Sequence, residues 1–168
     1  MKRKIKLLWQ KVKPYIIPYA IAIAIPLTVG LISAALTKDN MQVYRSLKTP
    51  PLSPPAILFP IVWTLLYILM GISSAMVYLK REKNIDGAKS GLVYYGFSLF
   101  LNFSWSIVFF NLQAAFFALV NLVALLVLVL KTIREYRKVC HTASYLQIPY
   151  VIWLIFAAYL NTTIWLLN

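Results

Sequence analysis

The sequence predicts an all-α integral membrane protein, a bundle of five transmembrane helices. Of its 168 residues, 61% are hydrophobic and only 12% are charged, whereas a soluble domain is about 45–50% apolar and about 25% charged. The apolar residues also fall into runs of about 20, the length that a helix needs to cross the hydrocarbon core of a bilayer. We therefore expect five spans joined by short connections, with no room for a second, soluble domain.

The first predicted span covers residues 15–36 and follows a basic N-terminal extension, residues 1–14, with six lysines and arginines. A secretory signal also begins with basic residues, but this apolar run is too long for a typical signal, so we expect a retained helix. Pro18 and Pro26 lie inside the run. Because membrane helices tolerate proline, we expect a bend there rather than a break. Residues 15–168 then form a single membrane domain.

The other spans are predicted at residues 56–79, 91–112, 115–131 and 146–167. The second follows a proline-rich loop, residues 37–55, and Pro54 and Pro55 suit a helix start, where the N–H that proline lacks has no partner to lose. The apolar stretch 92–130 is divided in two, because one helix of that length would reach about 58 Å in a core about 30 Å thick. Asn111 and Gln113 supply the polar centre of the turn. Charged loops are expected at 80–90 and 131–145.

Basic residues are concentrated on one side of the predicted bundle. The N-terminal extension and the two charged loops share a side that holds 14 lysines and arginines, against 3 on the other side. The positive-inside rule then places the N-terminus inside and the C-terminus outside, and we expect a bacterial cytoplasmic membrane. The charge does not indicate nucleic-acid binding, because it lies between apolar runs and forms no patch on a soluble face.

The polar residues exclude several kinds of chemistry. All four acids and the single His141 lie in loops or at span ends, whereas proton- and ion-driven transporters usually keep such residues at membrane depth. The single Cys140 allows no internal disulfide. The sequence has no phosphate-binding glycine loop, no Ser–His–Asp set and no zinc-ligand spacing. We therefore predict no metal site, no cofactor and no hydrolytic active site.

Aromatic residues at membrane depth are the remaining candidates for function. Trp63, Trp105 and Trp153 lie well inside their spans, where an indole N–H needs a partner. They either pack within the bundle or line an interior cavity. Asn102 and Asn161 leave the same choice open, between hydrogen bonds that join helices and the lining of a pocket. Helical i, i+4 spacing puts three pairs each on one face: Trp63 with Tyr67, Phe109 with Gln113, and Trp153 with Ala157.

A series of motifs between residues 44 and 161 adds a family resemblance. It begins with Leu47–Pro55 (LKTPPLSPP), Phe59, Val62–Thr64, Leu66–Tyr67 and Met70–Gly71, and continues with Leu101–Asn102, Trp105–Ser106, Phe109–Phe110, Pro149–Tyr150, Trp153, Phe156–Ala157 and Leu160–Asn161. Together and in this order, they resemble the TspO/translocator-protein family, the tryptophan-rich sensory proteins of the peripheral benzodiazepine receptor type. No single motif is specific by itself.

The resemblance implies a five-helix membrane bundle, usually a homodimer, with a pocket capped by the loop between the first two helices. Family ligands include porphyrins such as protoporphyrin IX, related tetrapyrroles, cholesterol in some members, and synthetic isoquinoline and benzodiazepine drugs. Some bacterial members are described as degrading protoporphyrin in light through paired tryptophans, which here would be Trp63 and Trp153. The ligand-binding residues that the resemblance implies are Tyr44, Phe59, Trp63, Tyr67, Ser106, Phe109, Gln113, Trp153 and Ala157.

The sequence also departs from the family pattern. Leu52 stands where the family often has tryptophan, and Ser106 stands where many bacterial members have asparagine. No basic residue follows Tyr159, so the C-terminal sterol motif of the family is absent. The run Leu130–Lys138 around Tyr136 fits the loose form of such a motif elsewhere in the chain.

Three functions stay open at this point. The first is a membrane-embedded binder of tetrapyrroles that senses, sequesters or photochemically degrades them. The second is a transporter of tetrapyrroles or other small hydrophobic molecules. The third is a regulatory membrane partner without ligand chemistry, for which the small-residue pairs Gly71–Ala75 and Gly87–Gly91 would provide close helix contacts.

Overall fold

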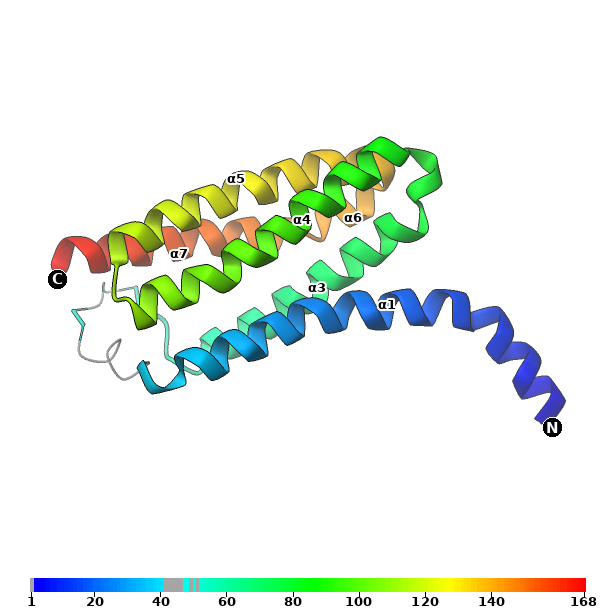
Figure 1. Cartoon of the computed structure of the whole chain (residues 1–168), viewed down its shortest axis with the longest axis horizontal. Coiled ribbons are helices and arrows are strands. Elements are labelled where there is room, and N and C mark those ends of the chain that lie inside the picture. Colours follow the sequence, from blue (N-terminus) through cyan, green and yellow to red (C-terminus); the bar gives the residue numbers. More distant parts are fainter. Residues whose placement is uncertain (1, 41–46, 49, 51) are drawn as a thin grey trace.

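The computed structural model describes residues 2–40, 47–48, 50 and 52–168, with side chains from residue 14 onward. Within these residues every regular element is a helix, and five segments are long and apolar enough to cross a membrane, which confirms the predicted fold class (Figure 1). The elements are α1 (Lys2–Thr37), η1 (Lys38–Asn40), α3 (Leu58–Leu79), η2 (Arg81–Lys83), α4 (Ile85–Ser106), η3 (Ile107–Asn111), α5 (Ala115–Val139), α6 (His141–Tyr145) and α7 (Ile148–Leu167).

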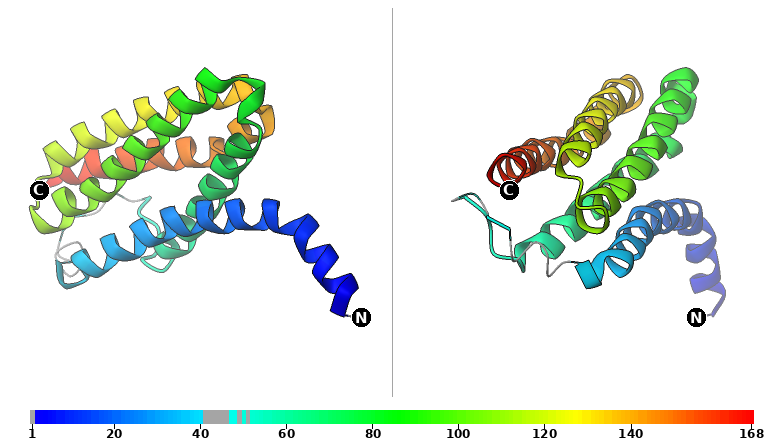
Figure 2. Two further views of the ribbon diagram at one scale, coloured as in Figure 1. Left: turned by 45° about the vertical axis from the view of Figure 1, so that its right-hand side comes forward. Right: turned by 60° about the vertical axis from the view of Figure 1, so that its left-hand side comes forward.

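The helices form a bundle in which sequence neighbours are also neighbours in space. α1 packs along α3, α4 packs along α5, and α5 packs along α7, as the two further views show (Figure 2). The N-terminus lies at one end of the molecule and the C-terminus at the other (Figure 1). The N-terminal end of the bundle also holds η2 and α6, and we call it the basic end. We call the opposite end, with the α4–α5 turn and the C-terminus, the outer end.

Helix α1 remains unbroken through Pro14, Pro18 and Pro26. It curves away from the bundle toward the N-terminus (Figure 1). The basic extension is therefore not a separate segment but the first turns of the same helix. Lysine, arginine and leucine dominate that stretch, and all three have high helix propensity.

Two glycines set how closely α1 approaches α3. A Cβ atom added at Gly71 would lie 2.5 Å from the Cα of Ile23 and 2.7 Å from the carbonyl oxygen of Ala22. On the other helix, Gly30 leaves space for the ring of Tyr67. Because a side chain at either position would push the backbones apart, the close contact of these helices depends on glycine.

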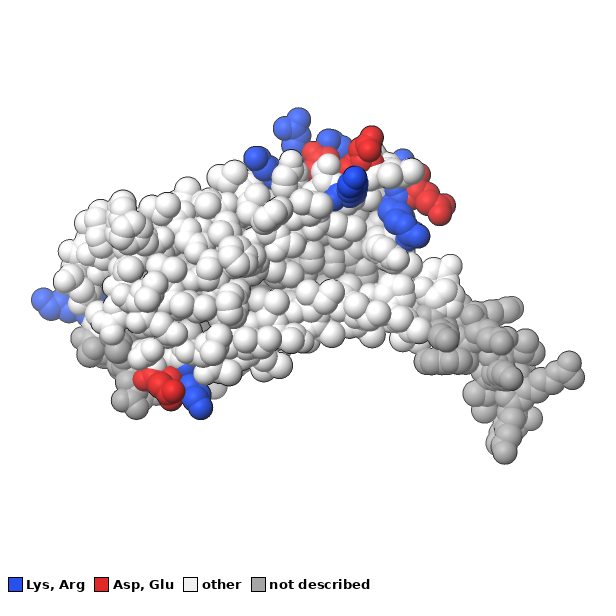
Figure 3. Space-filling model, in the orientation of Figure 1, with Lys and Arg blue, Asp and Glu red and all other residues white. Residues whose placement is uncertain are grey.

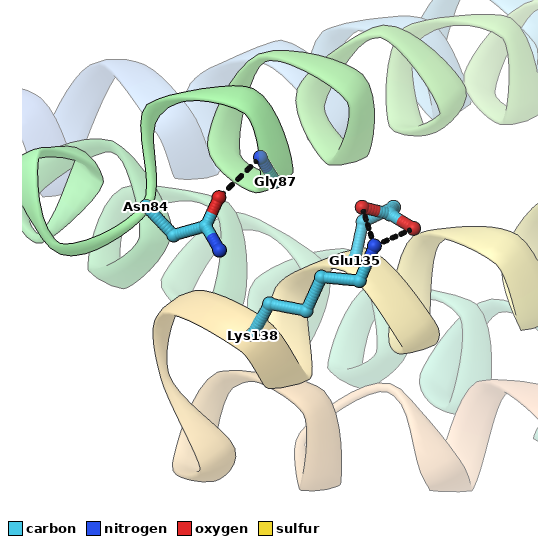
Figure 4. Close-up of polar contacts among 4 residues, drawn as sticks. All are labelled: Asn84, Gly87, Glu135 and Lys138. Carbon is cyan, nitrogen blue, oxygen red and sulfur yellow. Dashed lines mark hydrogen bonds and ion pairs between the residues drawn. The ribbon is translucent and has the colours of Figure 1, made fainter.

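Helix α4 begins six residues before the predicted span, and this corrects the predicted loop at 80–90. Asn84 caps the helix, since its Oδ1 accepts a hydrogen bond of 2.8 Å from the backbone N–H of Gly87 (Figure 4). Such an asparagine cap satisfies one of the N–H groups that a helix start leaves unpaired. Asp86 adds a negative charge in the first turn, where the helix dipole favours it.

Helix α5 runs on to Val139, beyond the predicted end at Lys131, and α6 follows at once. The predicted basic loop at 131–145 is therefore mostly helical. The physical reason is that Thr132, Tyr136 and Val139 keep the helical spacing and are buried, so the helix retains a packed face after it leaves the apolar run. Gly91 of α4 makes room for the Tyr136 ring, because a Cβ there would lie 2.7 Å from it.

Candidate ligand-binding site

Four of the sequence-predicted site residues meet in one aromatic cluster between α3 and α7. Phe59, Trp63 and Tyr67 follow one another along a face of α3, and Trp153 approaches them from α7. The ring centroids of Trp63 and Trp153 are 6.4 Å apart with planes at 88°, and those of Phe59 and Trp153 are 5.9 Å apart. Trp63 also contacts the Tyr67 ring at 5.5 Å. We call these four residues the tryptophan cluster.

One buried polar atom in the tryptophan cluster has no partner among the described residues. The Nε1 atom of Trp153 is shielded from solvent and makes no hydrogen bond within the described part of the chain. A buried donor without an acceptor costs about 1–3 kcal/mol, and each such group in a protein calls for an explanation. An acceptor atom on a bound ligand would remove this cost, so Trp153 offers a hydrogen bond to a molecule that enters the cluster.

A buried hydrogen-bond network is joined to the tryptophan cluster through Tyr67. The Tyr67 hydroxyl donates to Oδ1 of Asn102 at 2.8 Å, and Nδ2 of Asn102 donates to the Tyr150 hydroxyl at 2.8 Å. These three residues come from α3, α4 and α7, and all are buried. The network therefore fixes the three helices relative to one another and orients the Tyr67 ring. Of the two interpretations of Asn102, the structure supports the hydrogen bond between helices.

Trp105 has a different environment from Trp153. Its Nε1 donates to Oδ1 of Asn161 at 3.1 Å, and Nδ2 of Asn161 donates to the carbonyl oxygen of Ala115 at 2.8 Å. Its ring stacks on Phe109 with centroids 5.2 Å apart. Trp105 and Asn161 thus join α4, α5 and α7, and the indole N–H is satisfied within the protein.

A second location, at the outer end, holds two more of the predicted site residues. A hollow of about 530 Å³ is present there, which lies within the range of small-molecule sites. Phe109 and Gln113 line it, and the tryptophan cluster does not. Its other lining residues are Leu47, Phe110, Ala114, Ala115, Phe116, Phe117, Ile164, Trp165 and Asn168. The structure therefore divides the predicted site between a packed ring cluster and this outer hollow.

Gln113 has a left-handed backbone, with φ 52°. It is the central residue of the short connection between η3 and α5, and a residue other than glycine seldom adopts this conformation. The neighbouring Ala114 N–H donates to the Val108 carbonyl at 3.1 Å, which closes the turn. The backbone at this rim of the outer hollow is therefore strained, a feature that proteins often keep near functional sites.

The other predicted site residues are more dispersed. Ser106 is the last residue of α4 and is half-buried, and Ala157 is half-buried on α7, where it packs on the main core. Tyr44 lies outside the described residues. The structure thus brings together four of the nine predicted residues in the tryptophan cluster and two in the outer hollow.

Sequence reasoning missed how the first loop is fastened to the outer end. The backbone N–H of Lys48 donates to Oδ1 of Asn168 at 3.0 Å, and Nδ2 of Asn168 donates back to the Lys48 carbonyl at 3.2 Å. At the start of the loop, Nδ2 of Asn40 donates to Oδ1 of Asn111 at 2.9 Å. The polar residues Asn111 and Asn168 were visible in the sequence, but their partners, more than 70 positions away, were not.

The alternative sterol motif around Tyr136 has no lipid-facing aromatic residue. Tyr136 has 0% exposure and packs beneath Gly91 of α4. A sterol at the membrane surface of α5 has no contact with this ring, so the fold does not support that motif.

Five apolar helices around an interior of aromatic rings and buried amides define an α-helical integral membrane protein. The sequence profile of the TspO/MBR family matches residues 22–166. The "Tryptophan-rich protein TspO" of Chlorobaculum tepidum is 37% identical over 158 residues, which cover 91% of this chain and 97% of that protein. The protein of the same name from Archaeoglobus fulgidus is 37% identical and covers 84% of this chain and 91% of its own. The "Translocator protein" of Bos taurus is 31% identical, with 81% of each chain covered. The chain belongs to the TspO/MBR family.

Proposed function

We propose that this protein binds porphyrins or related tetrapyrroles within the membrane and acts in their sensing, sequestration or light-dependent degradation. The observation that carries the proposal is the unpartnered Nε1 of Trp153, which lies beside the rings of Trp63 and Phe59. A tetrapyrrole presents large apolar faces and acceptor atoms at its edges. Ring side chains with a free donor that is shielded from solvent suit such a molecule, since ligand sites combine apolar walls with few, well-placed polar groups.

The same two tryptophans are the candidate catalytic residues if degradation occurs. All ionisable acids and the single histidine of the chain lie at the ends of the spans, so acid–base chemistry has no carrier beside the rings. Trp63 and Trp153 would instead act as redox-active groups that stabilise a radical next to the macrocycle. The porphyrin would serve as its own chromophore, with light and oxygen as the driving agents.

We further propose a homodimer in a bacterial cytoplasmic membrane, with the basic end inside. Among the described residues, most lysines and arginines lie at the basic end (Figure 3). Arg81 and Lys83 of η2 are among them, while Lys38 of η1 and Lys48, which is bonded to Asn168, lie at the outer end. This asymmetry supports the orientation through the positive-inside rule. The outer hollow and the first loop then face the outside.

The experiment that tests the proposed function is a fluorescence titration of the purified protein with protoporphyrin IX, in the dark and then under light. We expect saturable quenching that weakens in the double variant Trp63→Phe, Trp153→Phe. Trp9→Phe is the matched control, because that tryptophan lies in the basic extension, in the first turns of α1, and belongs to neither candidate location. Loss of the porphyrin absorption band in light, in wild type but not in the double variant, would identify catalysis.

Two further outcomes separate the alternatives. Net uptake of porphyrin by vesicles that contain the protein, beyond the amount bound, would support a transporter. Absence of saturable quenching would contradict tetrapyrrole binding and leave a regulatory partner. For that last function, the small-residue pairs offer less than the sequence suggested, because Gly71 already packs on α1 and Gly91 on the Tyr136 ring.

A further inference from the structure

A second hollow, of about 430 Å³, lies at the basic end; it is shallow and open on the surface of α4. Asp86, Lys89, Ser90, Val93 and Tyr94 line it. Lys131 of the neighbouring helix α5 lies over the Tyr94 ring, with Nζ 5.7 Å from the ring centroid. Lys89 therefore lines the hollow, and the ammonium group of Lys131 lies beside Tyr94, another of its lining residues.

These two lysines are available to an anion. In the part of the chain that the structure describes, the one ion pair joins Glu135 to Lys138 at 2.7 Å (Figure 4). Glu135, the acid of α5 one turn beyond Lys131, is therefore already paired with another lysine. Neither Lys89 nor Lys131 has a carboxylate oxygen within ion-pair distance there. The space-filling view shows lysine and arginine atoms gathered at this end of the molecule, interspersed with acidic ones (Figure 3).

An apolar strip continues from the hollow toward the middle of α4. Val93, Phe97 and Phe100 follow at helical spacing, and their side chains are 48%, 59% and 64% exposed. From Lys89 to Phe100 the helix rises about 16 Å, so the strip runs into the apolar part of the span. A molecule that fills both regions needs an anionic head and a long apolar tail, which is the chemistry of an anionic phospholipid.

Asp86 narrows the choice of headgroup. Its carboxylate lies at the hollow one turn before Lys89 and disfavours a second negative charge on the occupant. It accepts hydrogen bonds, as does the Ser90 hydroxyl. We propose that this hollow binds phosphatidylglycerol, with the phosphate between Lys89 and Lys131, the glycerol hydroxyls at Asp86 and Ser90, and one acyl chain along Val93, Phe97 and Phe100. None of the residues that line the hollow belongs to the tryptophan cluster, and the site does not depend on tetrapyrrole binding.

Native mass spectrometry of the protein released from bilayer nanodiscs tests the proposal. The nanodiscs contain phosphatidylglycerol, phosphatidylethanolamine and phosphatidylcholine in equal amounts. We expect wild type to retain phosphatidylglycerol, and Lys89→Gln, Lys131→Gln to weaken its retention by roughly 25-fold, since one lysine near an anionic surface contributes roughly a factor of five. The matched control is Lys83→Gln, Arg137→Gln, which removes the same charge from the same end outside the hollow and should retain the lipid.

Three results would overturn the proposal. An equal loss of phosphatidylglycerol retention in both double variants would show that general surface charge causes the effect. Preferential retention of phosphatidylethanolamine would assign the hollow to a zwitterionic lipid. Thermal stabilisation of the detergent-solubilised protein by glycerol 3-phosphate to the same extent as by phosphatidylglycerol would indicate a site for a free phosphate. Stabilisation by the lipid alone, lost in Lys89→Gln, Lys131→Gln, supports the proposal even where mass spectra show partial delipidation.

Discussion

The indole rings of Trp63 on α3 and Trp153 on α7 meet edge to face, with centroids 6.4 Å apart and planes at 88°. This geometry is favourable for two aromatic rings, because the positive edge of one faces the negative face of the other. It also leaves the Nε1 of Trp153 without an acceptor in the described part of the chain. The two rings are therefore well packed, while the N–H group of Trp153 still needs an acceptor.

Trp105→Phe should reduce stability more than Trp153→Phe, whereas Trp153→Phe should weaken porphyrin binding more. Trp105→Phe removes a donor that is bonded to Asn161 and leaves a buried oxygen short of one partner, so we expect a loss of about 1–3 kcal/mol in stability. Trp153→Phe removes an unpartnered donor and should cost less, yet weaken porphyrin binding more. Thermal unfolding in detergent and fluorescence titration measure the two effects. Equal effects of both variants on binding would contradict the assignment of the free donor to the ligand.

Asn102→Leu should destabilise the bundle more than Tyr67→Phe. Asn102 bonds both Tyr67 and Tyr150, so its loss leaves two buried hydroxyls unpaired, whereas Tyr67→Phe removes one bond together with its donor. We expect a difference of about 1–3 kcal/mol. Chemical unfolding of the two variants in the same detergent gives the comparison. If Tyr67→Phe is the more damaging of the two, the network does not act through Asn102.

Gly71→Leu should disrupt the α1–α3 contact, while Gly96→Ala should not harm the fold. At Gly71 an added Cβ meets the Ile23 backbone, and at Gly96 it meets no atom of the described residues within 4 Å. We expect a loss of about 1–3 kcal/mol or more for the first change, as for overpacking, and a gain of up to about 1 kcal/mol for the second, from helix propensity. Thermal unfolding checks both. Tolerance of leucine at Gly71 would show that α1 is free to move outward.

Gln113→Gly should stabilise the α4–α5 turn, because glycine adopts the left-handed φ of 52° without steric cost. The expected gain is about 1 kcal/mol, set by the penalty that other residues carry in this conformation. Gln113→Val, with a branched Cβ, should lose a similar amount or more. Melting temperatures give the sign of each change. A loss of porphyrin affinity in a stabilised Gln113→Gly protein would show that the strained glutamine serves the ligand.

Local patterns in the sequence predicted one side of the tryptophan cluster. The i, i+4 spacing places Trp63 and Tyr67 on the same face of their helix, and they are in ring contact in the structure. The spacing holds no information about which residue faces them from another helix. Trp153 reaches Trp63 because α7 and α3 lie together and because Asn102 bonds to a tyrosine on each of them.

The sequence by itself determined the five spans, because the length and hydropathy of each run decide whether it crosses a bilayer. It did not determine where α5 ends, since the burial of Tyr136 under Gly91 extends that helix past its apolar run. Nor did it separate Phe109 and Gln113, at the outer hollow, from the tryptophan cluster. The length and hydropathy of an apolar run depend only on consecutive residues, so the sequence is enough to predict a span. Contacts between helices depend on the close approach of distant side chains, which only the tertiary structure decides.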